Sequence, residues 1–253
     1  VVMSDLQRAA KPHGLRFGPD PSTQNRATFG GMIGNNACGP RAVAYGRTAD
    51  NVSALTVVDG TGRELTAGRG PGALEVMPGL DKLVQANLAA IRTELGRFKR
   101  QVSGYSLEHL LPENGSDLAK MLVGTEGTLA TVLEATLDLV PVPSAPVLVA
   151  LGYPDMAAAA DAVPALLAHG PLAVEGIDAR LVEIVRRHHG PAAVPELPPG
   201  GGWLLVEVGG ADADDALERA RRLAADGGTD AVAVVPAGPQ ADALWRSRAG
   251  GAG

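Results

Sequence analysis

Residues 27–50 read ATFGGMIGNNACGPRAVAYGRTAD, and this first glycine stretch decides how the whole chain is interpreted. Its five glycines stand among two adjacent amides, the single cysteine and a tyrosine. Glycine lets backbone approach a ligand closely, and bare N–H groups form concave sites for anions or carbonyl oxygens. The alternative is a surface loop whose glycines serve only for turning. Long loops are usually functional or disordered, and Phe29, Met32 and Ile33 are too apolar for disorder, so we favour a ligand cradle.

The composition is that of a globular chain without a basic surplus. Of 253 residues, 45% are hydrophobic, 20% charged and 3% aromatic, so alanine, valine and leucine must build most of the core. The net charge of −6 argues against nucleic acid or an anionic membrane as the main partner. No apolar run is long enough to span a bilayer. One cysteine excludes an internal disulfide framework, the first residues show no signal-peptide pattern, and we expect a cytoplasmic location.

Turn signals and hydrophobic periods predict mixed helices and strands up to residue 143. A second glycine stretch, residues 124–128 with the sequence GTEGT, is predicted as a tight turn after an apolar strand. The strand that follows it is expected to place Thr131, Leu133, Ala135, Leu137 and Leu139 on one buried face. The other expected elements are a helix from Ser4 or Asp5 to about Pro12, a strand at 15–17, a hairpin of 51–59 with 63–66, a helix at 80–98 and a helix capped by Ser116 or Asp117.

Prolines 141, 143 and 146 form a stiff link at which we place a domain boundary. Beyond it strands alternate with helices, a pattern typical of a compact α/β or α+β layer sandwich. The expected strands are 146–153, 172–176, 203–208 and 230–235, and the expected helices are 155–169, 178–189, 212–226 and one that begins near 240.

Several common catalytic motifs are absent from the sequence. The spacings of a Rossmann fingerprint, a P-loop, an H-E-x-x-H zinc site and a G-x-S-x-G nucleophile elbow do not occur. What remains is a pair of glycine stretches suited to a flat or phosphorylated ligand.

GGMIGNNACGPRAVAYGRTADNV, with DPST before it and ENGSDLAKMLVGTEGTLATVLEATLDLVPVP after it, resembles the FAD-linked oxidases of the vanillyl-alcohol oxidase or p-cresol methylhydroxylase (PCMH) type. Within them it is most similar to the D-2-hydroxyacid dehydrogenases: glycolate oxidase flavoprotein subunit, D-lactate dehydrogenase and D-2-hydroxyglutarate dehydrogenase. NNACG and GTEGTL are similar to a bacterial branch in which this module is fused to an iron–sulfur half. The resemblance covers nearly the whole chain and is strongest over residues 15–143. It implies an α+β fold, with the second subdomain of a PCMH-type FAD-binding domain at 1–143 and a ferredoxin-like cap domain at 145–253.

The resemblance also implies the cofactor, FAD, and the residues that contact it. Backbone N–H groups at such positions can stabilise charge on the reduced flavin and its phosphates. Arg248, in the pattern Leu244-Trp245-x-x-Arg248, is similar to an arginine that binds the substrate carboxylate; the alternative is a solvated helix residue. The implied FAD contacts are Pro19, Asp20, Ser22 and Thr23 beside the flavin, Gly30, Gly31, Gly34, Asn35, Ala37 and Cys38 along the ring and its linker, Tyr45 and Gly46 at the close of the loop, and Gly124, Glu126, Gly127 and Thr128 at the distal part.

No metal site and no general base are assigned in this chain. The metal-binding histidines of the family are expected beyond Gly253, so the five histidines present are interpreted as structural or as helix-end residues. Cys38 is interpreted as a small buried hydrophobe rather than a covalent flavin attachment. Tyr45 and Tyr105 could face the flavin, but their spacing does not decide it.

The predicted function is FAD-dependent oxidation of a D-2-hydroxy acid of the lactate, glycolate or 2-hydroxyglutarate type. The resemblance implies hydride transfer to flavin N5 and electrons passed to an iron–sulfur partner or domain. Both ends look cut, and the family's first flavin subdomain is expected before Val1, so we expect a fragment. The alternative is a non-catalytic truncated remnant that does not bind flavin. A third possibility is a flavin oxidase for an alcohol or sugar lactone.

Overall fold

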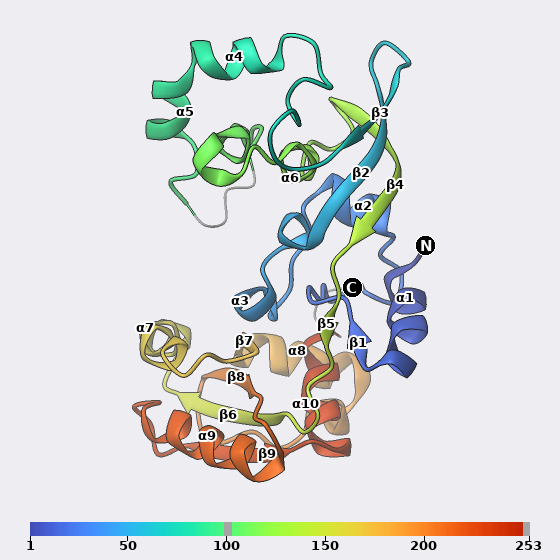
Figure 1. Ribbon diagram of the computed structural model, residues 1–253. Coiled ribbons are helices and arrows are strands. Elements are labelled where there is room, and N and C mark those ends of the chain that lie inside the picture. Colours follow the sequence, from blue (N-terminus) through green and yellow to red (C-terminus); the bar gives the residue numbers. More distant parts are fainter. Residues whose placement is uncertain (99–102, 250–253) are drawn as a thin grey trace. The chain divides into compact units, whose positions relative to one another are not determined.

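The computed structural model describes residues 1–98 and 103–249, with only the backbone at Ala192, Arg248 and Ala249 (Figure 1). The chain forms two compact units. Unit 1 comprises Val1–Gly39 and Gly46–Val140, and unit 2 comprises Pro40–Tyr45 and Pro141–Gly253. A short piece of the first glycine stretch, Pro40–Tyr45, therefore belongs to unit 2.

Unit 1 is built on a three-stranded sheet in the order β3-β2-β4 (Figure 1). β2 (Val52–Asp59) and β3 (Glu64–Ala67) form the predicted hairpin, with Val58 opposite Glu64. The Asp59 carboxylate fixes their turn because it accepts a 2.8 Å hydrogen bond from the Thr61 N–H. β4 (Ala130–Leu137) pairs antiparallel with the other edge of β2, and α6 (Leu118–Leu122) packs against β2.

The other elements of unit 1 are short. A small second cluster of Met3, Phe17, Phe29 and Met32 adds to the main core of the sheet and α6. The elements are α1 (Met3–Ala10), η1 (Lys11–His13), β1 (Leu15–Arg16), α2 (Phe29–Gly34), η2 (Thr48–Asn51), α4 (Leu80–Ala86), α5 (Leu88–Glu94), η3 (Leu107–Leu110) and η4 (Pro112–Asn114), with β5 (Val140–Pro141) paired to β1 at the end of the unit.

The predicted buried face of β4 is wrong at Thr131, Leu133 and Ala135, all of which are exposed. Ala130 is buried and Val132 packs against the core, whereas Leu133 is 52% exposed. The cause is an irregularity in the pairing with β2: Thr56 lies opposite Glu134 but Val57 lies opposite Val132. One extra residue on β4 reverses which side chains face the core. After it Leu137 packs inward, as predicted.

Two further expectations for unit 1 need correction. The helix expected at 80–98 is two helices, α4 and α5, separated at Asn87. Its side-chain amide donates to the Leu83 carbonyl at 2.8 Å and so ends α4 locally. The segment before Gly124 is the helix α6 rather than an apolar strand, and Asp117 caps it, because its carboxylate accepts from the Lys120 N–H at 2.8 Å.

Unit 2 follows the predicted alternation of strands and helices closely. Its four strands form one antiparallel sheet in the order β7-β8-β6-β9, the order of a ferredoxin-like sheet. Asp155, Asp178 and Asp212 each cap the helix that follows them. The elements are α3 (Ala42–Tyr45), β6 (Val147–Tyr153), α7 (Met156–Leu167), β7 (Ala173–Asp178), α8 (Ala179–His189), η5 (Pro191–Ala193), β8 (Gly202–Val208), α9 (Ala213–Ala225), β9 (Val232–Pro236) and α10 (Pro239–Ala249).

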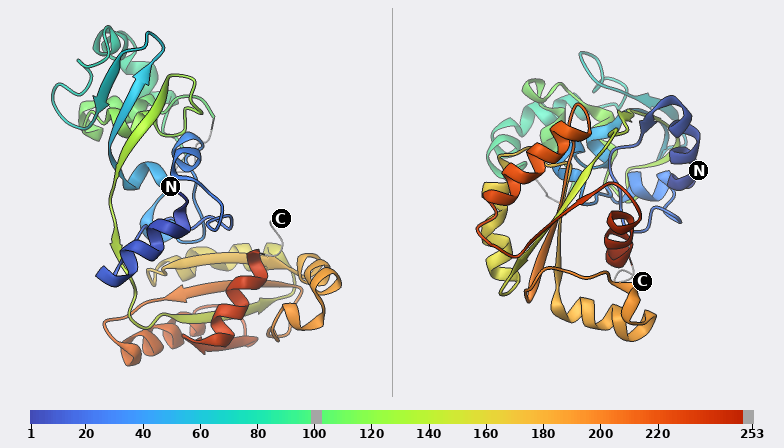
Figure 2. Two further views of the ribbon diagram at one scale, coloured as in Figure 1. Left: turned by 90° about the vertical axis from the view of Figure 1, so that its right-hand side faces the viewer. Right: turned by 90° about the horizontal axis from the view of Figure 1, so that it is seen from below.

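Both faces of the unit 2 sheet are covered. On one face Val149 and Val206 pack against α7 and α9, and on the other Leu148 and Leu205 pack against α8 and α10. Figure 2 shows α9 and α10 on opposite sides of the sheet. This burial on both sides explains why β6 and β8 are nearly continuous apolar runs.

Candidate functional site

The first glycine stretch begins with the helix α2. Thr28 caps it, since its Oγ1 accepts from the Gly31 N–H at 3.2 Å. Phe29 is buried and meets the Phe17 ring edge-on at 5.1 Å between centroids. Gly30 is exposed like Gly31, so the helix presents a bare backbone face opposite its apolar one.

The second glycine stretch hydrogen-bonds to the end of α2. The Gly124 N–H donates to the Ile33 carbonyl at 2.8 Å, and the Glu126 N–H donates to the Gly34 carbonyl at 3.0 Å. Positive φ angles of 89° at Gly124 and 54° at Glu126 turn the chain back for these bonds. The two predicted segments therefore form one continuous backbone platform, which we call the glycine platform.

A cavity of about 250 Å³ adjoins α2 in unit 1. Its walls combine small apolar surfaces with hydroxyl, amide and guanidinium groups, and Gly31 leaves one wall without a side chain. These properties fit part of a flat ring system with polar edges, at the small end of the usual range of ligand pockets. The lining residues are Pro21, Thr23, Arg26, Ala27, Thr28, Gly31, Met32, Asn35 and Ala37.

The structure brings only some of the other predicted FAD contacts to the cavity or the glycine platform. Asp20 is buried, and Cys38 is half-buried. The Thr128 hydroxyl lies 2.9 Å from the Tyr105 hydroxyl. Tyr45 lies in α3, in unit 2, while its neighbour Gly46 lies in unit 1. Of the predicted contacts, Thr23, Gly31, Asn35 and Ala37 line the cavity, and Gly34, Gly124 and Glu126 belong to the glycine platform. Arg248 lies in α10, and its side chain is outside the described residues.

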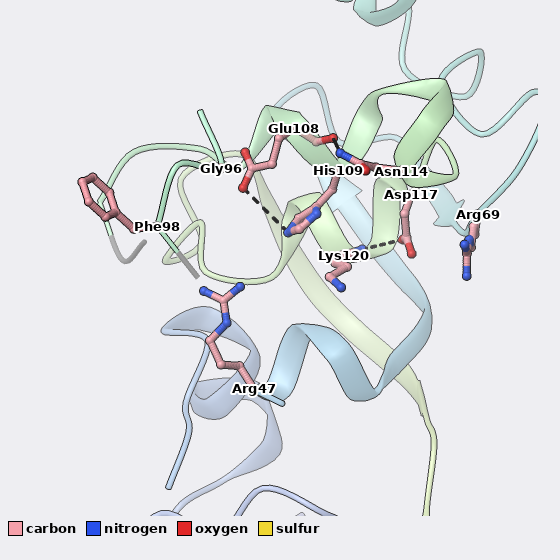
Figure 3. Close-up of a pocket in the computed structure, with 9 residues that line it drawn as sticks. All are labelled: Arg47, Arg69, Gly96, Phe98, Glu108, His109, Asn114, Asp117 and Lys120. Atoms are coloured by element: carbon pink, nitrogen blue, oxygen red, sulfur yellow. Dashed lines mark hydrogen bonds and ion pairs between the residues drawn. The ribbon is translucent and has the colours of Figure 1, made fainter. Parts of the chain in front are cut away.

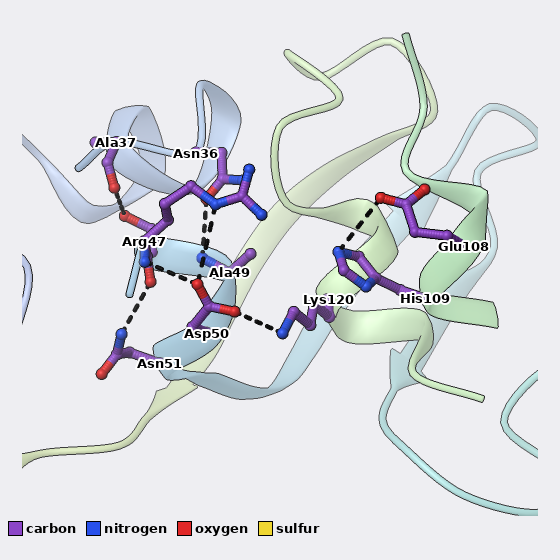
Figure 4. Close-up of polar contacts among 10 residues, drawn as sticks. Asn36, Ala37, Arg47, Ala49, Asp50, Asn51, Glu108, His109 and Lys120 are labelled. Carbon is purple, nitrogen blue, oxygen red and sulfur yellow. Dashed lines mark hydrogen bonds and ion pairs between the residues drawn. The ribbon is translucent and has the colours of Figure 1, made fainter. Parts of the chain in front are cut away.

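A polar network holds the end of the first glycine stretch (Figure 4). The Asn36 side chain accepts from the Ala49 N–H at 3.0 Å, and the Asp50 carboxylate accepts from the Arg47 N–H at 2.8 Å and pairs with Lys120 at 2.5 Å. Burial alone would raise the pKa of Asp50, but the hydrogen bonds and positive charges of Lys120 and Arg47 hold it below its ordinary value. The charged Asp50 carboxylate therefore connects the first glycine stretch to α6 through its ion pair with Lys120.

A second cavity of unit 1, about 320 Å³ in volume, lies over η3 and α6 (Figure 3). Burial lowers the pKa of His109, and the charges of Lys120 and Arg47 add to this against the opposing carboxylates of Glu108 and Asp50. Glu108 Oε2 is buried without a hydrogen-bond partner among the described residues. Charges of both signs line this cavity: Arg47, Arg69, Gly96, Phe98, Glu108, His109, Asn114, Asp117 and Lys120.

Sequence reasoning missed a buried charge cluster in unit 2. Arg41, within the first glycine stretch, contacts both carboxylate oxygens of Glu207, at 2.7 and 2.6 Å from Nη2. The Trp245 indole N–H donates to Glu207 at 3.1 Å, and the Arg41 guanidinium lies 5.5 Å from the Trp245 ring centroid. The available signal was the lone carboxylate in the apolar strand WLLVEV.

The described ranges, 1–98 and 103–249, contain neither a cluster of metal-binding side chains nor a helix that could span a membrane. No group of three or more histidine, cysteine, aspartate or glutamate side chains is arranged to hold a metal ion there. None of the helices in those ranges is long and apolar enough to cross a membrane.

Comparison with known families identifies both parts of the chain. Residues 1–68 match the FAD binding domain family, and residues 142–253 match the C-terminal domain of FAD linked oxidases. The chain belongs to the FAD-linked oxidases. Both families indicate FAD as the cofactor, and the cavity beside α2 fits part of such a ligand.

Curated relatives of this FAD-linked oxidase chain are 2-hydroxy acid dehydrogenases and oxidases. It is 36% identical over 200 residues to the D-2-hydroxyglutarate dehydrogenase of Pseudomonas putida, a match of 74% of this chain and 20% of the relative. It is 28% identical over 242 residues to the D-lactate dehydrogenase of Anaerostipes hadrus, covering 92% of this chain and 43% of that protein. The glycolate oxidase subunit GlcD of Bacillus subtilis is 33% identical over 168 residues, covering 66% of this chain and 28% of the subunit. The chain thus spans less than half the length of these relatives.

A solved structure supports the fold. An alkyldihydroxyacetonephosphate synthase matches with a TM-score of 0.57 at 16% identity, covering 100% of this chain and 41% of that one. At this level of identity the likeness bears on the fold alone.

Proposed function

We propose that the chain is the flavin- and substrate-binding portion of an oxidoreductase that oxidises a D-2-hydroxy acid. Residues 1–143 would belong to the FAD-binding domain and residues 145–253 to the substrate domain. The observation that carries the proposal is the glycine platform, in which the N–H groups of Gly124 and Glu126 bond to the end of α2 beside the 250 Å³ cavity. The names of the curated relatives support the reaction class.

The residues of unit 1 would bind and orient the cofactor. Bound FAD would supply the acceptor atom, N5, for the hydride that leaves the α-carbon of the hydroxy acid. Thr23, Thr28 and Asn35 offer polar groups to the ring edge, whereas Gly31 and Ala37 leave space for its face. Arg26, at the same cavity, would place a positive charge beside an anionic part of the cofactor.

In unit 2 we propose Arg248 as the residue that holds the substrate carboxylate. A guanidinium can bind a carboxylate through two parallel hydrogen bonds and so orient the neighbouring α-carbon. The sequence pattern Leu244-Trp245-x-x-Arg248 supports this role. Leu244 is buried under the sheet, so its packing anchors α10.

The substrate, the electron acceptor and the cellular compartment are each proposed from a separate observation. D-2-hydroxyglutarate is the first candidate substrate, because four relatives of 29 to 36% identity carry that name. Transfer of electrons to an iron–sulfur partner rests on the resemblance of NNACG and GTEGTL to the fused bacterial branch. The single free cysteine, Cys38, fits a reducing compartment such as the cytoplasm.

Anaerobic flavin reduction tests this function. The chain is loaded with FAD, alone and fused behind the segment of the Pseudomonas putida relative that precedes its matching region, and then mixed with D-2-hydroxyglutarate, D-lactate or glycolate. We expect loss of the long-wavelength flavin absorbance with at least one of these acids and none with L-2-hydroxyglutarate.

Two outcomes contradict the proposal in different ways. Flavin that is retained but not reduced by any hydroxy acid excludes the substrate class and leaves the alcohol or sugar-lactone oxidase as the better account. Failure of both forms to retain flavin favours the truncated remnant without cofactor binding.

A further inference from the structure

The segment Pro40–Tyr45 is an excursion of the first glycine stretch into unit 2, bounded by a glycine at each end. At Gly39 an added Cβ would stand 2.5 Å from the carbonyl carbon of Asp20. At Gly46 the φ angle is +73°, and a Cβ would stand 2.5 Å from the Asp50 carboxylate. Neither junction can accept a side chain without displacing its neighbours, so each end of the excursion packs closely against a residue of unit 1.

The tip of the excursion is held by a buried ion pair. Arg41 reaches Glu207 through Nε at 3.2 Å and through Nη2 at 2.7 and 2.6 Å. The side chains are 15% and 5% exposed. The Pro40 carbonyl also accepts a hydrogen bond from the Val174 N–H of β7 at 3.3 Å. Both the side chain and the backbone of the excursion are therefore bound to the unit 2 sheet.

The Arg41–Glu207 ion pair lies among buried apolar side chains, where burying charge is energetically unfavourable. Glu207 lies on β8, whose neighbouring side chains are apolar and buried on both faces. A buried ion pair is frequently no more stable than apolar residues of the same volume, because both charges lose their hydration. One role of such a pair is conformational specificity.

We propose that Arg41 is a positioning residue of the flavin site. By binding Glu207 it holds the excursion in unit 2 and thereby fixes the backbone on either side of it, Ala37–Gly39 and Gly46–Thr48. The same carboxylate binds Trp245 of α10, the helix that carries Arg248. Within unit 2, Glu207 therefore binds both the tip of the excursion and α10. The role of Arg41 in a flavin site rests on the proposed function. Its effect on the backbone at 37–39 and 46–48 can be tested without FAD.

Hydrogen exchange of the cofactor-free chain tests the inference. Arg41→Gln removes the charge, and Arg187→Gln is the matched control because Arg187 forms an exposed pair with Glu183 in the same unit, at 2.6 Å. In the Arg41 variant we expect exchange at 37–39 and 46–48 to become several-fold faster, and by a larger factor than any change in β6 and β8, because the loss of the pair also destabilises unit 2. The control variant should exchange like the wild type. Arg41→Lys keeps the charge but loses the bidentate geometry and should give an intermediate effect.

Two results would overturn the inference. One is unchanged exchange at both junctions in the Arg41→Gln variant. The other is faster exchange spread equally through β6 and β8, which would reduce the pair to a support of unit 2. If Arg41→Gln alone does not fold, the double variant Arg41→Gln/Glu207→Gln removes both charges and is judged by the same two criteria.

Flavin affinity gives a second readout that separates this inference from the proposed function. If the wild-type chain binds FAD, Arg41→Gln should weaken binding about tenfold and Arg187→Gln should not. If neither the wild-type chain nor its fused form binds FAD, the proposed function fails, and exchange at the junctions still decides whether Arg41 positions them.

Discussion

Neutralising Glu207 is expected to destabilise unit 2 far more than neutralising any exposed carboxylate on its surface. The Glu207→Gln variant keeps the shape of the side chain but removes the negative charge that the Arg41 guanidinium, 15% exposed, binds in this pair. Three hydrogen bonds from Arg41 and one from Trp245 end on this carboxylate. The matched control is Glu183→Gln, whose 2.6 Å ion pair is exposed.

The magnitude follows from burial. Removing one partner of a buried ion pair costs roughly 3–5 kcal/mol, and the partial exposure of Arg41 favours the lower end. For a unit of this size, somewhat above 100 residues, about 3 kcal/mol corresponds to a fall in Tm of about 12 °C. The exposed control should lose less than about 0.5 kcal/mol. Replacing both Arg41 and Glu207 by methionine should recover most of the loss, because both charges of the pair are then removed.

Urea denaturation followed by far-UV circular dichroism and by Trp203 and Trp245 fluorescence measures these differences. Fluorescence reports on unit 2, where both tryptophans lie. The reasoning is refuted if Glu207→Gln costs less than about 1 kcal/mol, the net value of one ordinary hydrogen bond. It is also refuted if the double methionine variant is as unstable as the single one.

Three further predictions concern single residues. Gly39→Ala should destabilise unit 1 by about 1–3 kcal/mol in urea titrations, because its Cβ would collide with Asp20, whereas Gly60→Ala, where no atom lies within 4 Å, should cost under about 0.5 kcal/mol. The pKa of His109 lies below its ordinary value of 6.5, so the unfolded chain takes up the proton first and stability should fall as pH decreases below 6.5. Denaturation midpoints across that range should lose this slope in His109→Gln, and an unchanged slope contradicts the assignment. Tyr153→Phe should cost about 1 kcal/mol by calorimetry, because it removes a buried 2.8 Å hydrogen bond; no change in Tm would show that the bond contributes nothing.

Much of unit 2 could be predicted from the sequence because its signals are local. Asp155, Asp178 and Asp212 cap helices of regular period, and apolar runs mark the strands between them. Unit 1 was harder to predict because its deviations depend on pairing and on single side chains. The extra residue near Leu133 becomes visible only against β2, and the break at Asn87 depends on one amide bonding to a carbonyl.

In the candidate site, too, local sequence signals could be predicted and contacts between distant residues could not. The glycine-rich composition and the resemblance indicated which segments bind the cofactor, but not that Gly124 and Glu126 hydrogen-bond to the end of α2. The Arg41–Glu207 pair joins residues far apart in sequence, and no local pattern predicts which partner an arginine will choose. A charged residue within an apolar strand was the one sequence signal of that pair.

The most direct test of the account is a titration of the chain with FAD, followed by flavin fluorescence, in the wild type and two variants. Gly31→Leu places a side chain at the wall of the 250 Å³ cavity, where its Cβ would lie 3.3 Å from Thr28 Oγ1. Gly60→Leu adds the same group where nothing lies within 4 Å. The account predicts saturable binding by the wild type and by Gly60→Leu, and binding at least about tenfold weaker, or 1.4 kcal/mol, in Gly31→Leu. Equal affinities for all three proteins would contradict it.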